Sequence, residues 1–262
     1  MLAASRSAFT AWNARALLTL RATTSRLVCP NNSDVVCRAL QRRGPFASSS
    51  VPSMANTTPA DVLAFWFGPE ALEVRSVMST DEFMNAGKKM WYFGGKEVDV
   101  QSQRFVPAIE AAAEGTLPWD DDDDDANLAK VILFDQLTRN AFRGTPKAFA
   151  YDDKALDIAR RLIRREAYWE VAELNFIASP HLHSERLSDH DAALAAVFRH
   201  KEKHAEALHS LVYLEGAIVS HRDVIAEFGR YPHRNKALGR ASTPEEESWL
   251  ASDDRPGWSK TQ

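Results

Sequence analysis

The chain has 262 residues and a formal net charge of −4, but this charge is divided unevenly along it. Residues 1–53 contain seven Arg, no Lys and one acid, giving 7 − 1 = +6, whereas the remainder contains 25 basic and 35 acidic residues, giving 25 − 35 = −10. A negative body argues against nucleic-acid binding, which needs a basic surface. Both cysteines, Cys29 and Cys37, lie before residue 54, so the body cannot use a disulfide, a Cys nucleophile, an iron–sulfur cluster or a Cys-ligated zinc.

Residues 1–53 form a leader that is rich in Arg, poor in acids and amphipathic. Its apolar stripe consists of Phe9, Trp12, Ala16, Leu20 and Leu27. These properties are typical of a transit peptide and favour a mitochondrion over a plastid. The alternative is an extension without a targeting role, in which case Met54 would start a cytoplasmic form. No apolar run is long enough to span a bilayer, so we expect no membrane span.

The body begins with clear helix signals. Thr58 can cap a helix that has Pro59 in its first turn and ends at Gly68. A second helix is expected over residues 98–114, broken near Pro107. Six consecutive acids follow at residues 120–125 and lack the spaced ligands and glycine of a calcium loop. We interpret them as a solvated loop that caps the next helix.

The segment VILFDQLTRNAFRG, residues 131–144, is the one around which the chain is organised, and on a helix it has a broad apolar arc and an unusual polar arc. The apolar arc consists of Val131, Leu133, Phe134, Leu137 and Ala141. The polar arc consists of Asp135, Gln136, Arg139, Asn140 and Arg143. Guanidinium groups suit carboxylate or phosphate partners, and Asp135 can pair with Arg139 four residues on. The polar arc is therefore either a buried network between helices, which we favour, or the wall of a ligand pocket.

Helical patterns continue to the end of the body. They cover residues 156–163, 169–178 (ended by Ser179-Pro180), 188–198, 205–228 (ended by Gly229) and 243–250. No segment alternates with the period of a strand, so the fold is predicted to be all-α, with seven to nine helices. We expect one domain over residues 54–252 and a polar tail over 253–262.

All eight histidines lie between His181 and His233, and four of them belong to three polar segments. These are PHLHSE (180–185), which we predict to be a non-helical turn, SHRD (220–223) and RYPHRN (230–235). The side chains of His183, Glu185, His221 and His233 are of the types that bind metals. No pair has the helical spacing of a metal site and HExxH is absent, so we predict no metal site.

Three stretches, LFDQLTRNAFRGT, HSE and SHRDVIAEFGRYPHRNKALGRASTPEE, resemble the family called domain of unknown function 924. The resemblance covers roughly residues 59–251 and implies an all-helical, tetratricopeptide-like fold without an established activity. Two positions differ from the family pattern. Thr138 stands where a Pro is usual and should leave the helix regular, and Arg186 replaces an acid. The fold is accordingly expected to be antiparallel helix pairs stacked as a short array.

Two functions from different classes are compatible with these segments. In the first, the protein is a binding module whose pocket offers guanidiniums to an anionic small molecule or peptide. In the second, it is a hydrolase-like enzyme that uses histidines and carboxylates as acid–base groups or metal ligands. We favour binding because no nucleophile or metal motif is present, and we expect no cofactor. The predicted pocket residues are Asp135, Arg139, Asn140, Arg143, His183, Glu185, His221, Arg222, Arg230, His233, Arg234 and Asn235.

Overall fold

The computed structural model describes residues 57–165 and 169–260, and every regular element within these ranges is helical. The leader and Met54 lie outside the described residues. The first part comprises α3 (Pro59–Phe67), α4 (Pro69–Glu73), η1 (Arg75–Ser79), α5 (Asp81–Trp91), α6 (Gly95–Ser102), η2 (Gln103–Phe105) and α7 (Val106–Glu114). The middle comprises α8 (Asp124–Val131), η3 (Ile132–Leu137), α9 (Thr138–Ala141), η4 (Pro146–Phe149), α10 (Asp152–Leu162) and α11 (Val171–His183). The last part comprises α12 (Leu187–Lys203), η6 (Ala205–Ala207), α13 (Leu208–Phe228), η7 (Pro232–Arg234), α14 (Pro244–Ala251) and η8 (Gly257–Lys260).

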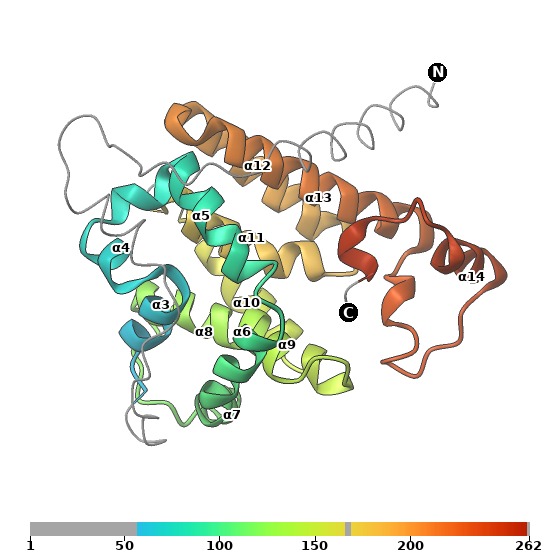
Figure 1. Cartoon of the computed structure of the whole chain (residues 1–262), viewed down its shortest axis with the longest axis horizontal. Coiled ribbons are helices and arrows are strands. Elements are labelled where there is room, and N and C mark those ends of the chain that lie inside the picture. Colours follow the sequence, from blue (N-terminus) through green and yellow to red (C-terminus); the bar gives the residue numbers. More distant parts are fainter. Residues whose placement is uncertain (1–56, 166–168, 261–262) are drawn as a thin grey trace. The chain divides into compact units, whose positions relative to one another are not determined.

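The fold is therefore all-α, as predicted (Figure 1). Successive helices pack against each other, α10 on α11, α11 on α12 and α12 on α13. None of the helices described is long and apolar enough to cross a membrane.

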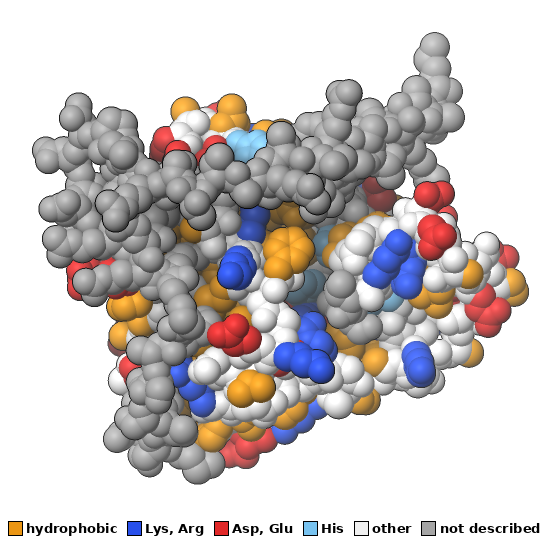
Figure 2. All heavy atoms as spheres, in the orientation of Figure 1, with side chains coloured by type: hydrophobic (Ala, Val, Ile, Leu, Met, Phe, Trp, Pro, Cys, Tyr) orange, Lys and Arg blue, Asp and Glu red, His pale blue; other side chains and the backbone are white. Residues whose placement is uncertain are grey.

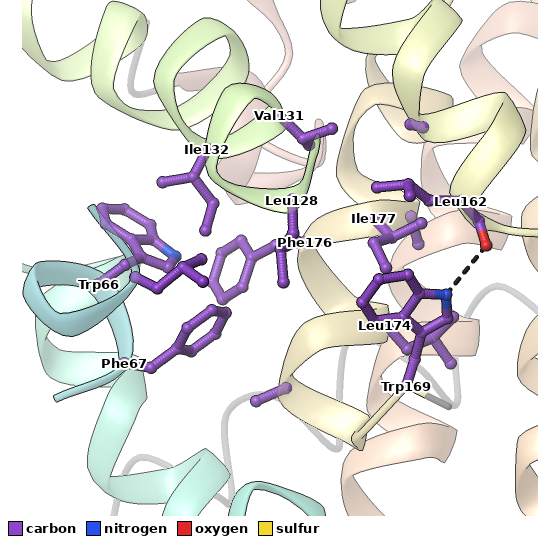
Figure 3. Close-up of a cluster of buried hydrophobic side chains, with 14 of the residues drawn as sticks. Trp66, Phe67, Leu128, Val131, Ile132, Leu162, Trp169, Leu174, Phe176 and Ile177 are labelled. Atoms are coloured by element: carbon purple, nitrogen blue, oxygen red, sulfur yellow. Dashed lines mark hydrogen bonds between the residues drawn. The ribbon is translucent and has the colours of Figure 1, made fainter. Parts of the chain in front are cut away.

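The core is centred on α11, which packs against α8 and whose Phe176 contacts the aromatic rings of α3 (Figure 3). The rings of Trp66 and Phe176 meet edge to face with centroids 5.2 Å apart. Trp169 donates from Nε1 to the Leu162 carbonyl at 2.9 Å, which joins the start of α11 to the end of α10. Burying each such side chain stabilises the fold by about 1.5–3 kcal/mol. The position of α11 is thus strongly determined, and its C-terminal end reaches the site.

Several helix boundaries confirm the sequence predictions. Thr58 and Asp61 form a capping box at the start of α3, and the chain breaks before Pro107, which lies in the first turn of α7. Asp123 caps α8. The acidic run is also held by ion pairs, for example Asp125 with Arg75 at 2.6 Å. The acidic run therefore binds neighbouring elements through ion pairs, in addition to forming a solvated loop.

The organising segment differs from the regular helix that was expected. Residues Ile132–Leu137 form a π-helix between α8 and α9. Thr138 donates its backbone N–H to the Leu133 carbonyl, and its Oγ1 donates to the same oxygen at 2.8 Å. The extra residue in this turn changes which side chains face inward, and π-turns of this kind often occur at functional sites. Asp135 is fully buried and pairs with Arg139, as expected for the buried network that was favoured from the sequence.

The prediction that PHLHSE is a non-helical turn was wrong for its first four residues. Helix α11 continues through Pro180 and ends at His183. A proline in the last turn removes only one backbone hydrogen bond, and the hydroxyl of Ser179 donates to the Asn175 carbonyl at 2.9 Å just before it. The imidazole of His183 is thereby fixed to the end of a core helix.

Candidate functional site

A cavity of about 700 Å³ opens between α5, α9, the end of α11, α13, the residues after η7, and η8. Figure 2 shows a hollow in this face of the molecule, with histidine side chains at its back and apolar and basic side chains around it. From the predicted pocket it is lined by Arg139, Asn140, Arg143, His183, His221 and His233. These residues come from the segment 131–144 and from all three polar segments, so helix packing places the four segments around one cavity.

Helix α13 forms one long wall of this cavity. Tyr213, Leu214, Ala217 and His221 lie along one face of the helix and all contact the cavity. At about 1.5 Å per residue, Tyr213 and His221 are separated by about 12 Å along the helix. The cavity is therefore elongated, with an aromatic end near Tyr213 and an imidazole end near His221.

At the imidazole end, Asp135 and His183 form a buried carboxylate–imidazole pair. Nδ1 of His183 lies 2.6 Å from Oδ1 of Asp135. The same carboxylate pairs with Arg139 at 3.0 Å and accepts a hydrogen bond from Gln136 at 2.5 Å. A carboxylate can only accept, so His183 carries its proton on Nδ1 and leaves the lone pair on Nε2. No group in the described residues hydrogen-bonds this Nε2, and His183 lines the cavity.

The charge states of this pair follow from its surroundings. Burial acts to raise the pKa of Asp135, but the charges of Arg139 and His183 outweigh burial and hold it well below its usual range. Burial and the neighbouring Arg139 lower the pKa of His183, and Asp135 offsets this only in part. At neutral pH the pair is therefore an ionised carboxylate beside a neutral imidazole, whose Nε2 accepts a hydrogen bond or a proton.

A second layer of charges supports the pair. Arg139 also binds Asp152 at 2.9 Å, and Arg234 approaches the same carboxylate at 3.4 Å. Both guanidiniums lie over the ring of Phe149, at 5.7 and 5.0 Å from its centroid. Arg234 also donates to the backbone carbonyl of His183 at 3.0 Å. This network holds the end of α11 against α9 and α10.

His221 is positioned by a different set of contacts. Its Nδ1 lies 2.7 Å from the Ala217 carbonyl, and its ring stacks on Trp258 with centroids 3.8 Å apart and planes inclined by 14°. Its ring centroid is 6.4 Å from that of His183. Burial lowers the pKa of His221 well below the ordinary histidine value. His221 is therefore a second neutral imidazole, whose Nε2 is also an acceptor.

The guanidiniums proposed from the sequence are matched by carboxylates. Arg143, 44% exposed at the side chain, binds Asp99 through two bonds of 2.9 and 3.0 Å. Arg139 binds Asp135 and Asp152, as described above.

The cavity also has a cation that the sequence analysis did not identify. Lys236 is exposed and lines the cavity, and its ammonium group makes no ion pair or hydrogen bond with any residue that the structure describes.

The remaining predicted residues lie outside the cavity wall and have structural partners. Asp135 lies behind His183. Glu185 accepts from the backbone N–H of Tyr231 at 2.9 Å and pairs with Arg240 at 2.8 Å. The other partnerships are Arg222 with Asp191 at 2.8 Å, Arg230 with Glu246 at 2.6 Å, Arg234 with Asp152, and Asn235 with Ser242 and Glu246 at 3.1 Å each. These bonds fix the chain after α13 onto its neighbours.

The described residues contain no group of three or more His, Cys, Asp or Glu side chains arranged to hold a metal ion. His183 and His221 are each committed to a hydrogen bond through Nδ1. The arrangement is suited to hydrogen bonding and proton transfer by imidazoles within a partly aromatic cavity.

Several lining residues could not be singled out from the sequence. Tyr213 belongs to a segment that was read only for helix content, and Tyr92 to one for which neither a helix nor a site was predicted. Trp258 lies in the segment expected to be a polar tail, yet it stacks on His221 and donates from Nε1 to Ser220 at 3.1 Å. An isolated Trp among polar residues is the one signal that pointed to it. Lys236 directly follows the RYPHRN segment, and that adjacency was its only signal.

Comparison with solved structures finds a chain from Agrobacterium tumefaciens, described as the structure of protein of unknown function ATU0120. It is 29% identical, with a TM-score of 0.56, and the match covers 74% of this chain and 96% of that one. A comparison with curated protein sequences finds no match. A family model described as bacterial protein of unknown function (DUF924) matches residues 62–254, which is well over half of the chain. The chain therefore belongs to the DUF924 family.

Proposed function

We propose that the cavity binds a small molecule that carries an anionic group. The observation that carries this proposal is Lys236, an ammonium group with no carboxylate partner among residues 57–165 and 169–260, at the wall of a cavity of about 700 Å³. The volume lies within the usual range for small-molecule sites. Arg143 and Asn140 also line the cavity and can add hydrogen bonds, since Arg143 is partly exposed. A peptide is less well supported, because a cavity of this size accommodates only a short terminus.

The two imidazoles define what else the ligand must offer. His183 and His221 present acceptor nitrogens, so the ligand needs a donor such as a hydroxyl, an amide N–H or a singly protonated phosphate. The anion of the sequence hypothesis is retained, but its main cationic partner is Lys236. The paired Arg139 contributes mainly by fixing His183.

The test is calorimetric titration of the full chain with methyl phosphate and with acetate, the smallest phosphate-ester and carboxylate probes. We expect one of them to bind, more weakly as salt is added because the attraction is electrostatic. Lys236→Ala should weaken binding several-fold. Lys203→Ala, which removes an exposed ammonium from the end of α12, is the matched control and should change nothing. Equal affinities for the parent and Lys236→Ala would refute the assignment of the anion site.

One observation favours a second candidate, a hydrolase-like enzyme. The contact of 2.6 Å between Asp135 and His183 orients an imidazole so that its free Nε2 lines the cavity. Such a group can take a proton from a water molecule that attacks an acyl carbon, and return it to the departing oxygen. Turnover of 4-nitrophenyl acetate by the full chain, lost in His183→Gln but kept in His209→Gln, is the expected result. Equal rates for the parent and His183→Gln would exclude this role.

Two further proposals come from the sequence. We propose that α10, α11, α12 and α13 form a tetratricopeptide-like array, which the contacts between consecutive helices support.

We also propose that the leader directs the chain to a mitochondrion, supported by its charge of +6 and its apolar stripe. Fusing residues 1–53 to a fluorescent protein tests this targeting, and a diffuse cytoplasmic signal would contradict it.

A further inference from the structure

The aromatic end of the cavity has features that anion binding does not explain. Tyr92 and Tyr213 are 46% and 44% exposed, so both leave a large aromatic surface in contact with solvent. Both line the cavity, together with Trp91 and Leu214. Exposed aromatic side chains gathered at the mouth of a cavity mark a binding surface more often than a chance arrangement.

These two tyrosines are also held in place. Tyr92 accepts a hydrogen bond from Nδ2 of Asn175 at 2.8 Å, which ties the end of α5 to α11. The ammonium of Lys88 lies 4.7 Å from the centroid of the Tyr213 ring. Their ring positions are therefore set before any ligand arrives, and a preorganised aromatic surface binds with little loss of side-chain entropy.

The polar groups lie at the other end of the same wall. His221 is two turns along α13 from Tyr213, about 12 Å away, and it faces His183. A ligand that touched both ends would be about as long as two fused rings with a polar substituent. Phosphate or acetate alone would leave the tyrosine end unoccupied.

We infer that the ligand is an amphiphile with a planar aromatic body, which packs on Tyr92 and Tyr213, and an anionic head directed towards the histidines and Lys236. This inference rests on the proposed anion site and names the class of molecule that the site takes. Aromatic pairs add to the stabilisation that comes from burying apolar area, so the body should contribute at least as much affinity as the head.

The experiment compares three phosphate monoesters on the full chain, namely methyl, octyl and naphthyl phosphate. Naphthyl phosphate should bind at least ten-fold more tightly than methyl phosphate, and more tightly than octyl phosphate. Tyr213→Ala should remove most of this advantage and leave methyl phosphate binding unchanged. Val219→Ala, which shortens another exposed apolar side chain of α13 that does not line the cavity, is the matched control.

The outcomes separate the two proposals. If methyl phosphate binds and naphthyl phosphate binds no better, the aromatic body is refuted while the anion site stands. If octyl phosphate equals naphthyl phosphate, the end is apolar but does not select planar groups, and the inference is again overturned. If naphthyl phosphate binds and Lys236→Ala has no effect on it, the aromatic end stands and the anion assignment fails. If no ester binds, the inference is refuted, and the anion site stands only if acetate binds.

Discussion

Replacing Asp135 by Ala should destabilise the protein strongly. Its carboxylate is fully buried and is the common partner of Arg139, His183 and Gln136. Breaking a buried pair costs roughly 3–5 kcal/mol. Arg139 keeps Asp152 as a partner at 2.9 Å, so we expect about 3 kcal/mol, near the lower end of that range. This is a large share of a typical stability of about 5–15 kcal/mol.

Urea unfolding followed by circular dichroism at pH 7 measures this change. Asp135→Asn keeps the volume but removes the charge, so it separates the loss of the ion pair from the void that Ala leaves. Asp122→Ala, which removes an exposed carboxylate from the acidic run, should change stability by less than about 0.5 kcal/mol. If Asp135→Ala proved as stable as the parent, the buried network could not be what holds the helix, and Asp135 would have to act on a ligand.

The same carboxylate predicts how the difference depends on pH. Because the pKa of Asp135 is lowered in the folded protein, its stabilisation is complete above the unfolded value of about 4 and is lost as the pH falls further. The gap between the parent and Asp135→Asn should therefore shrink by about 1 kcal/mol between pH 5 and pH 3. A gap that stayed constant over this range would show that Asp135 is not ionised in the folded state.

Three further predictions concern other parts of the chain. Burial raises the pKa of Glu173 to about 7, and the charge of Arg75 offsets this only in part. The parent should therefore lose up to about 3 kcal/mol of stability as the pH rises from 5 to 8, whereas Glu173→Gln should not. If urea unfolding showed the same pH dependence for both proteins, this prediction would be contradicted. Trp258→Ala removes the stacking on His221 and should cost roughly 1–3 kcal/mol in urea unfolding, whereas a loss under about 0.5 kcal/mol would show that the C-terminal segment does not support the cavity. A chain that begins at Met54 should melt at the same temperature as the full chain in calorimetry, and a large drop would mean that the leader belongs to the fold.

The helical class and most helix boundaries could be predicted because they depend on local signals. The capping box at Thr58, the glycine after Phe228 and the break before Pro107 are short-range features that the structure retains. The repeat-like stacking of helices depends on long-range packing and stays a prediction. The same limitation applies to Pro180, which local rules treat as a helix end although tertiary packing keeps it within α11.

The site could be predicted only in part. The three polar segments stood out by composition, and helix packing brings residues from each of them to one cavity. Spacing could not show that a π-turn buries Asp135 against His183, because one extra residue per turn rotates the side chains that follow. Nor could it show which cations have carboxylate partners. Arg143 is paired with Asp99, which lies 44 residues earlier, and Lys236 is left unpaired among the described residues.

Native mass spectrometry of the full chain taken from cells tests the central claim, that the cavity is a small-molecule site, most directly. Ala217 lines the cavity on α13, so Ala217→Trp fills the space and serves as the matched variant. We predict a non-covalent mass on the parent protein that is absent from Ala217→Trp and is released on denaturation. A parent protein with the mass of its polypeptide alone, or the same additional mass on Ala217→Trp, would contradict the account.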